Sequence, residues 1–135
     1  MKQWDTGDTA TTSLVIDYTS NAVFGALTWD RNPVHFDDKR MKNTHFKRPI
    51  ANGIHCITQI GASLVELFTT PETMVIALEQ HNTFIKPIYV GTSIRAVVTI
   101  DECQPNHTYW LQCLVYDEDG EIAISCRFRV RVLDA

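Results

Sequence analysis

The sequence lacks three features that would place it in a membrane, outside the cell or on nucleic acid. No apolar run approaches the ~20 residues that a membrane-spanning helix needs, so we expect no membrane segment. Residues 1–8 carry one lysine and no apolar stretch, so we expect no secretory signal. The formal net charge of −4 at pH 7 argues against a nucleic-acid partner, which requires a basic surface.

Cysteine pairs with the spacing of metal or redox sites are also missing. The four cysteines are Cys56, Cys103, Cys113 and Cys126. They form no Cys-x-x-Cys pair, so neither a zinc site nor a disulfide framework is indicated. We interpret them as free thiols in a reducing compartment, which predicts a cytoplasmic location. The histidines lack the i, i+4 spacing of a helical metal site, and we expect no metal ion and no cofactor.

What the chain does have is the composition of a globular protein. Its 135 residues are 44% hydrophobic and 21% charged, which are ordinary values for a soluble fold. This length suits one domain that is large enough to bury a core. We therefore predict a single domain over residues 1–135, without linkers or repeats.

Alternating side chains predict a sheet in the second half of the chain. In residues 122–132 every second side chain is apolar and three of those between are arginines, which is the period of a strand. The Asp-Glu-Asp-Gly turn at residues 117–120 predicts a hairpin with residues 108–116. Further strands are predicted over residues 92–100, 74–85 and 11–18. We expect the sheet to be antiparallel and mostly sequential.

The longest helical pattern covers residues 53–68. Apolar residues recur there at three- and four-residue steps, opposite a polar stripe. The apolar set is Ile54, Ile57, Ile60, Gly61, Leu64 and Phe68, and the polar set is His55, Gln59, Ser63 and Glu66. A shorter helix is predicted over residues 20–28. A long helix with an antiparallel sheet predicts an α+β fold in which the sheet wraps around the helix.

Asp30 and His35 bracket a stiff turn and are the candidate catalytic residues. Pro33 has a fixed φ and pushes Asn32 towards an extended conformation. The imidazole of His35 is readily tuned to lose and regain a proton near neutral pH, and Asp30 is suited as its proton-transfer partner. A capped turn with a surface histidine is the alternative interpretation of the same residues.

A longer pattern around these residues resembles a known family. The matching residues are 24–37 (FGALTWDRNPVHFD), Phe46, 49–51 (PIA), Gly53, 84–91 (FIKPIYVG) and the Asp119-Gly120 turn. They resemble the MaoC-like, (R)-specific enoyl-CoA hydratases over most of the chain from residue 21 onward. The resemblance implies the hotdog fold, an antiparallel sheet wrapped around a long central helix, in agreement with the fold predicted above.

The resemblance implies reversible addition of water to a trans-2-enoyl thioester, carried by CoA or a carrier protein, to form an (R)-3-hydroxyacyl thioester. It implies that Asp30 and His35 hold one water between them. His35 would take a proton from this water as it attacks the β-carbon, and Asp30 would handle the proton delivered to the α-carbon. The N–H of Gly53 would hold the thioester oxygen. A homodimer or higher homo-oligomer is also implied.

An independent physical argument supports Gly53 in this role. Attack at the β-carbon moves negative charge onto the thioester oxygen, and unpaired N–H groups at the start of a helix are suited to receive it. A glycine leaves the approach to these groups open because it has no side chain. The alternative is that Gly53 serves close helix packing or a cap.

Three positions depart from the family's usual pattern. Trp29 stands where glycine is usual, and its large side chain is expected to shorten the acyl pocket or to stack on a ring-bearing substrate. Asn52 stands where histidine is usual; it is able to hydrogen-bond or cap the helix but not to carry a proton. Gly61 lies where related enzymes place a hydroxyl that orients the acid, so the absence of this hydroxyl is expected to loosen Asp30 unless Gln59 or a water substitutes.

Candidate substrate-contacting residues are Trp29, Asn32, Asn52 and His55. Fixing the turn is the alternative role for Asn32, and packing or a surface position is the alternative for His55. The basic side chains on the predicted C-terminal strand either meet the phosphates of coenzyme A or an acidic carrier protein, or form a solvated face. They are Arg127, Arg129 and Arg131.

Three functions remain open at this point. We favour a hydratase, or in reverse a dehydratase, in fatty-acid, polyester or polyketide metabolism. A MaoC-like dehydratase, isomerase or cyclase with a specialised biosynthetic substrate is the second, and Trp29 and Asn52 motivate it. The third is a non-catalytic hotdog subunit, which the presence of both Asp30 and His35 argues against.

Overall fold

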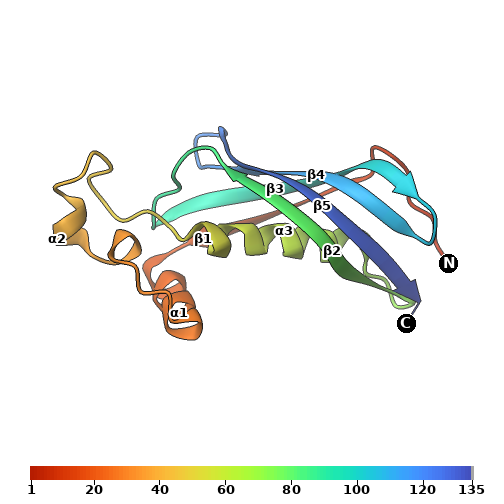
Figure 1. Cartoon of the computed structure of the whole chain (residues 1–135), viewed down its shortest axis with the longest axis horizontal. Helices are drawn as coiled ribbons and strands as arrows, with labels where there is room; N and C mark the ends of the chain where they lie inside the picture. Colours follow the sequence, from red (N-terminus) through yellow and green to blue (C-terminus); the bar gives the residue numbers. More distant parts are fainter. Residues whose placement is uncertain (135) are drawn as a thin grey trace.

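A five-stranded antiparallel sheet curves around one long helix, α3, in the computed structural model (Figure 1). The structure describes residues 1–134; Ala135, the last residue of the predicted domain, lies outside the described residues. The elements in chain order are β1 (Thr9–Ile16), α1 (Tyr18–Thr28), the 3₁₀ turn η1 (Pro33–His35), α2 (Asp38–Met41), α3 (Gly53–Phe68), β2 (Thr73–Phe84), β3 (Thr92–Gln104), β4 (Thr108–Tyr116) and β5 (Ile122–Asp134). The predicted α+β fold with a wrapped central helix is confirmed.

The strand order is β1-β3-β4-β5-β2. Strands β3, β4 and β5 are neighbours in chain order, as predicted, but β2 pairs with β5 and not with β3. The expected mostly sequential order is therefore wrong for β2. Residues 85–91, which include Pro87, are too many for a tight hairpin, and they carry the chain across the end of the sheet instead.

α3 packs on the concave face of the sheet through most of its predicted apolar stripe. The buried members are Ile57, Ile60, Leu64 and Phe68. Ile54 is instead 53% exposed. The predicted polar stripe is wrong for His55 and Ser63, which are buried because Phe24 of α1 and Thr12 of β1 cover that side of the helix. There the Ser63 hydroxyl donates to the carbonyl of Ala96 (3.0 Å), and His55 stacks on Phe24 of α1.

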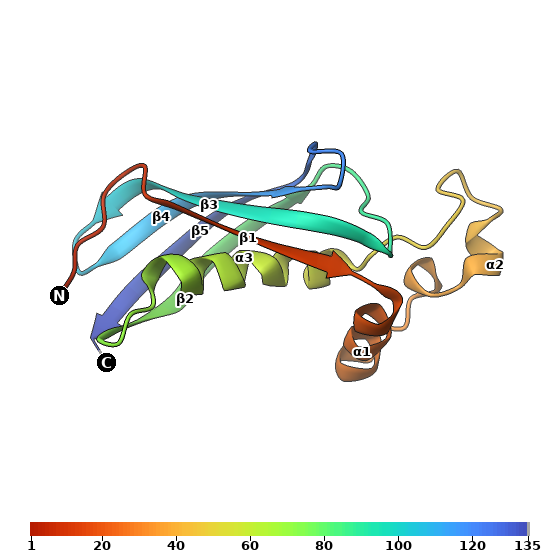
Figure 2. The ribbon, with the colours of Figure 1, turned by 180° about the vertical axis from the view of Figure 1, so that it is seen from behind.

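The chain between β1 and α3 forms one end of the molecule. Figures 1 and 2, seen from opposite sides, both show α1 and α2 beyond the N-terminal end of α3, at the far end from both chain termini. Asp30 and His35 belong to this end. Within residues 1–134, no helix is long and apolar enough to cross a membrane.

Candidate active site

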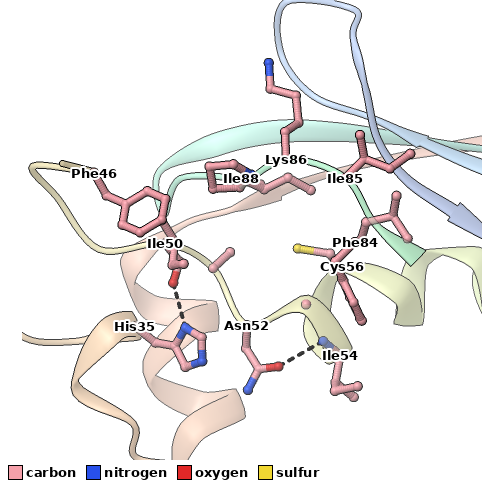
Figure 3. Close-up of a pocket in the computed structure, with 14 residues that line it drawn as sticks. His35, Phe46, Ile50, Asn52, Ile54, Cys56, Phe84, Ile85, Lys86 and Ile88 are labelled. Carbon is pink, nitrogen blue, oxygen red and sulfur yellow. Dashed lines mark hydrogen bonds between the residues drawn. The ribbon is translucent and has the colours of Figure 1, made fainter. Parts of the chain in front are cut away.

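A cavity of about 460 Å³ opens at the N-terminal end of α3 (Figure 3). Its apolar wall is formed by Phe46, Ile50, Ala51, Ile54, Phe84, Ile85, Pro87, Ile88 and Ile124. The lining is completed by His35, Asn52, Gly53, Cys56 and Lys86. A concave, mostly apolar site with a few polar groups is typical of a small-molecule pocket.

His35 is held at the edge of this cavity by local structure on both sides. Asn32 caps η1, where its Oδ1 accepts from the Val34 N–H (3.2 Å), and Pro33 occupies the first position of the turn. The His35 Nδ1 lies 2.7 Å from the carbonyl oxygen of Ile50. Because a carbonyl only accepts, Nδ1 must carry the hydrogen, and in the neutral ring Nε2 is then the free proton acceptor.

Asp30 is held by Asn52. The Nδ2 of Asn52 donates to Asp30 Oδ2 (2.7 Å), while its Oδ1 accepts from the Ile54 N–H (2.9 Å) and so caps α3. Asn52 is only 6% exposed. Asp30 and His35 are thus tied to Asn52 and Ile50, which lie two residues apart immediately before α3. The structure brings the two candidate catalytic residues to the same end of this helix.

Gly53 is the first residue of α3 and faces Phe84. A Cβ atom at this position would lie 2.3 Å from the Phe84 ring, so the aromatic side chain occupies the space that any other residue would need. Within residues 1–134 its N–H has no hydrogen-bond acceptor. The close packing that the sequence left as an alternative is therefore present together with an unpaired donor at the helix start.

The remaining predicted contact residues lie outside the cavity lining. Trp29 is 80% exposed and has a left-handed φ of 62°, a conformation that favours the glycine usual at this position. The Arg31 guanidinium lies 5.3 Å from its ring. His55 is buried against Phe24 (4.5 Å between rings), and its Nδ1 has no hydrogen-bond partner among residues 1–134. Burial lowers the pKa of His55, and the nearby Asp17 carboxylate partly opposes this.

Gln59 does not replace the hydroxyl missing at Gly61. Its Nε2 donates to the Oγ1 of Thr12 (2.8 Å). Gly61 is exposed, and no atom of the described residues lies within 4 Å of the place that a Cβ would take there.

Asp30 accepts from the Asn52 side chain at Oδ2 and from the Asn32 N–H at Oδ1 (3.4 Å). The position of Asn52 before the helix indicated that it caps α3. The sequence did not indicate its hydrogen bond to Asp30, because the two residues are 22 positions apart in the chain.

Two further polar groups in the lining are accounted for by their surroundings. Burial raises the pKa of Cys56 to about 12, which favours the protonated thiol over the thiolate. Lys86 pairs with Asp117 (2.7 Å) and Glu121, and these carboxylates raise its pKa.

The sequence reasoning missed the apolar wall, although Phe84 and Ile88 lie within the motif at residues 84–91.

The arginines of β5 do not belong to the cavity lining. Arg127 pairs with Asp101 (3.0 Å), and Arg129 pairs with Glu79 (2.6 Å). Both guanidinium groups also lie near the Trp110 ring. These contacts favour the solvated face that the sequence left as the alternative.

Comparisons with known proteins give this chain a family and several relatives. The family model described as "MaoC like domain" matches residues 3–109. An (R)-specific enoyl-CoA hydratase of Aeromonas caviae is 30% identical over 107 residues, covering 77% of each chain. One of Rhodospirillum rubrum is 26% identical over 103 residues, covering 76% of this chain and 70% of that protein.

The solved structures agree with these relatives. The (R)-hydratase from A. caviae involved in PHA biosynthesis matches with a TM-score of 0.89 and 25% identity, covering 97% of this chain and 98% of that one. The predicted hotdog fold is thereby confirmed.

Proposed function

Since the chain belongs to the MaoC-like domain family, we propose that it is a hydro-lyase that hydrates trans-2-enoyl thioesters reversibly to (R)-3-hydroxyacyl thioesters. The observation that carries the proposal is the attachment of Asp30 and His35 to the segment that begins α3, beside an apolar cavity. The relatives named (R)-specific enoyl-CoA hydratases support the reaction type.

In the proposed mechanism, one water lies between the two catalytic side chains. Nε2 of His35 takes a proton from the water as its oxygen attacks the β-carbon, and Asp30 supplies the proton that the α-carbon gains. The imidazolium then returns its proton to Asp30, so the pair is reset. The hydrogen bond from Nδ1 to Ile50 supports this assignment because it leaves Nε2 as the base.

The thioester oxygen gains negative charge during the attack, and we assign its stabilisation to the N–H of Gly53. The unpaired donor at the start of α3 and the helix dipole favour this position. The acyl chain is assigned to the apolar cavity, with Phe46, Phe84 and Ile88 in its wall. Of the residues outside the lining, Trp29, Asn32 and His55 stay predictions as substrate contacts.

The first test is hydration of a panel of enoyl-CoA esters from short to long chains. Loss of the ultraviolet absorbance of the conjugated thioester reports addition of water, and chiral analysis of the product reports its hand. We expect the (R)-3-hydroxyacyl thioester, with the panel giving the preferred chain length. A protein that leaves every member unchanged would contradict the proposal.

A second candidate function is a MaoC-like dehydratase, isomerase or cyclase with a specialised substrate. The observation that favours it is the exposed Trp29 immediately before Asp30, together with Asn52 in place of the usual histidine. A non-catalytic subunit is less well supported, because both proton-transfer side chains are present and held. Inertness on the whole enoyl-CoA panel would turn attention to this second candidate.

Asn52→Ala is expected to lower both stability and turnover, because the side chain caps α3 and holds Asp30. Loss of the cap costs about 1 kcal/mol of unfolding free energy, and a misplaced Asp30 lowers kcat by roughly tenfold or more. Asn52→Ser is the matched control, since its hydroxyl keeps the cap but is too short to hold Asp30. Denaturant unfolding and hydration rates distinguish the two effects. A kcat of Asn52→Ser equal to wild type would show that Asp30 does not depend on Asn52.

We also propose that the chain functions as one domain in a homodimer or higher homo-oligomer in the cytoplasm. The edge strand β2 carries the exposed apolar side chains of Met74, Ile76 and Leu78, which would favour binding of a second copy of the chain. Sedimentation that gives only monomer at micromolar concentration would contradict the assembly.

The proposed cytoplasmic location is supported by the cysteines. Buried free thiols at Cys56, Cys113 and Cys126 suit a reducing compartment.

A further inference from the structure

Helix α1 buries one polar side chain, and that side chain reaches the proposed base. Asn21 is 4% exposed, and Asn21 and Gly25 are the buried residues of this helix. The Nδ2 of Asn21 donates to the carbonyl oxygen of His35 (2.9 Å) across 14 positions of the chain. Among residues 1–134 this amide is the one hydrogen-bond donor to that carbonyl. The buried polar group of α1 therefore contacts the backbone of His35.

The ring of His35 is held by a different part of the chain. Its Nδ1 lies 2.7 Å from the carbonyl oxygen of Ile50, and the Ile50 N–H donates to the carbonyl of Val34 (3.0 Å) (Figure 3). These two bonds tie the ring and the preceding residue to the segment that begins α3. They leave the carbonyl of His35 to α1. The orientation of the base thus depends on two separate elements, and either attachment alone would let the residue pivot.

Helix α1 is fixed against the same segments by two further contacts. The Phe24 ring stacks on His55 of α3, with 4.5 Å between ring centres and 9° between ring planes, and His55 lies two residues after Gly53. At Gly25, a Cβ would lie 2.4 Å from the ring of Phe36, so this ring packs directly against the backbone of α1. Helix α1 therefore contacts both the turn that carries the base and the first turn of α3, where we place the donor to the thioester oxygen.

Packing alone does not require an asparagine at position 21. The Oδ1 of Asn21 is buried and has no hydrogen-bond partner among residues 1–134. A buried carbonyl oxygen without a partner costs free energy, whereas an apolar side chain of similar size, such as leucine, carries no such oxygen. What the amide adds is the hydrogen bond to His35.

We propose that Asn21 is a positioning residue for His35, whose amide keeps Nε2 of the imidazole in place relative to Asp30 and the N–H of Gly53. The inference rests on the proposed function. Without the amide, the imidazole is held by Ile50 alone, and a smaller fraction of the enzyme presents Nε2 in the reactive orientation. Because Asn21 does not line the cavity, its loss should change kcat and leave KM nearly the same.

The first test is the variant Asn21→Leu, assayed on the preferred member of the enoyl-CoA panel. We expect kcat to fall roughly 10- to 100-fold and KM to stay within about twofold of wild type. The matched control is Ser20→Ala, which removes a hydroxyl that donates to the Asp17 carbonyl (3.1 Å) in the same helix. Its kcat should stay close to wild type. If Asn21→Leu does not fold, Asn21→Ala removes the same amide without adding volume, and the same results are expected.

A double variant separates positioning from a general effect on the fold. In the His35→Ala background, Asn21→Leu should lower kcat no further, because no imidazole is left to position. An equal loss in the wild-type and His35→Ala backgrounds would overturn the inference. A kcat of Asn21→Leu equal to that of Ser20→Ala would also overturn it.

A second readout does not depend on turnover. Nitrogen NMR shifts of the imidazole give the fraction of the tautomer with its hydrogen on Nδ1, and the His35→Ala spectrum assigns the signals of His35. We expect this tautomer to predominate in wild type and Ser20→Ala, and to become mixed with the other in Asn21→Leu. If wild type hydrates no member of the panel, the proposed function fails and this measurement decides the inference. An unchanged tautomer fraction in Asn21→Leu would then overturn it.

Discussion

Asp30→Asn is expected to lower kcat for enoyl-thioester hydration by roughly 10²- to 10⁴-fold while the fold stays intact. The amide has nearly the same shape as the carboxylate, and its oxygen still accepts from the Asn52 Nδ2. It is unable to supply and regain the proton that the α-carbon exchanges. The loss should therefore appear in kcat, with KM changed little. Ultraviolet hydration assays measure both constants, and far-ultraviolet circular dichroism checks the fold.

His35→Ala is the companion to this variant. It removes the proposed base and the hydrogen bond to Ile50, and we expect a loss in kcat of the same order. If the two residues act on one water, the Asp30→Asn/His35→Ala double variant should be little worse than the poorer single variant, because groups that act as a unit are not additive. Strictly additive losses would indicate that the residues act in independent steps. If the kcat of Asp30→Asn is within threefold of the wild-type value, Asp30 has no part in the mechanism.

Gly53→Ala is expected to lower kcat/KM about 100-fold, because the new methyl group would meet the Phe84 ring at 2.3 Å. Either the start of α3 or the Phe84 ring must move. A shift of the helix start displaces the N–H that we assign to the thioester oxygen, and a shift of the ring changes the wall of the cavity. Because Phe84 is 55% exposed and its ring is able to move aside, the cost in stability should stay at the low end of what overpacking causes, about 1 kcal/mol. Hydration kinetics and denaturant unfolding measure the two effects.

Two variants identify the cause. Gly53→Ala/Phe84→Ala removes the ring that the methyl group meets. Its kcat/KM should therefore lie close to that of Phe84→Ala alone, and the loss caused by Gly53→Ala should be smaller in the Phe84→Ala background than in wild type. Gly61→Ala adds the same methyl group in the same helix, at a place where no atom of residues 1–134 lies within 4 Å. It should leave kcat/KM unchanged and raise stability by about 0.5–1 kcal/mol, because alanine favours the helix. A Gly53→Ala protein with wild-type kinetics would show that the Gly53 donor has no part in the reaction.

The site was predictable from the sequence only as a set of residue types. The Asp30–His35 spacing, Pro33 and Gly53 indicate a proton-transfer pair near a helix start, and the longer motif supplies the family. The apolar wall was not predictable, because Phe46, Phe84 and Ile124 come from three distant parts of the chain. Nor was the role of Asn52, whose cap is a local interaction but whose bond to Asp30 spans 22 residues.

The sequence by itself determined the local elements. The helix Gly53–Phe68 and the strand Thr108–Tyr116 have the bounds that periodicity predicts, since side-chain period, turns and prolines act within a few residues. The tertiary structure decided what covers each element. It placed β2 beside β5 and buried His55 and Ser63 under α1 and β1. It also brought the residues that line the cavity together beside His35. These outcomes depend on contacts between segments far apart in the chain, and one element's pattern shows which faces are apolar but not which partner covers them.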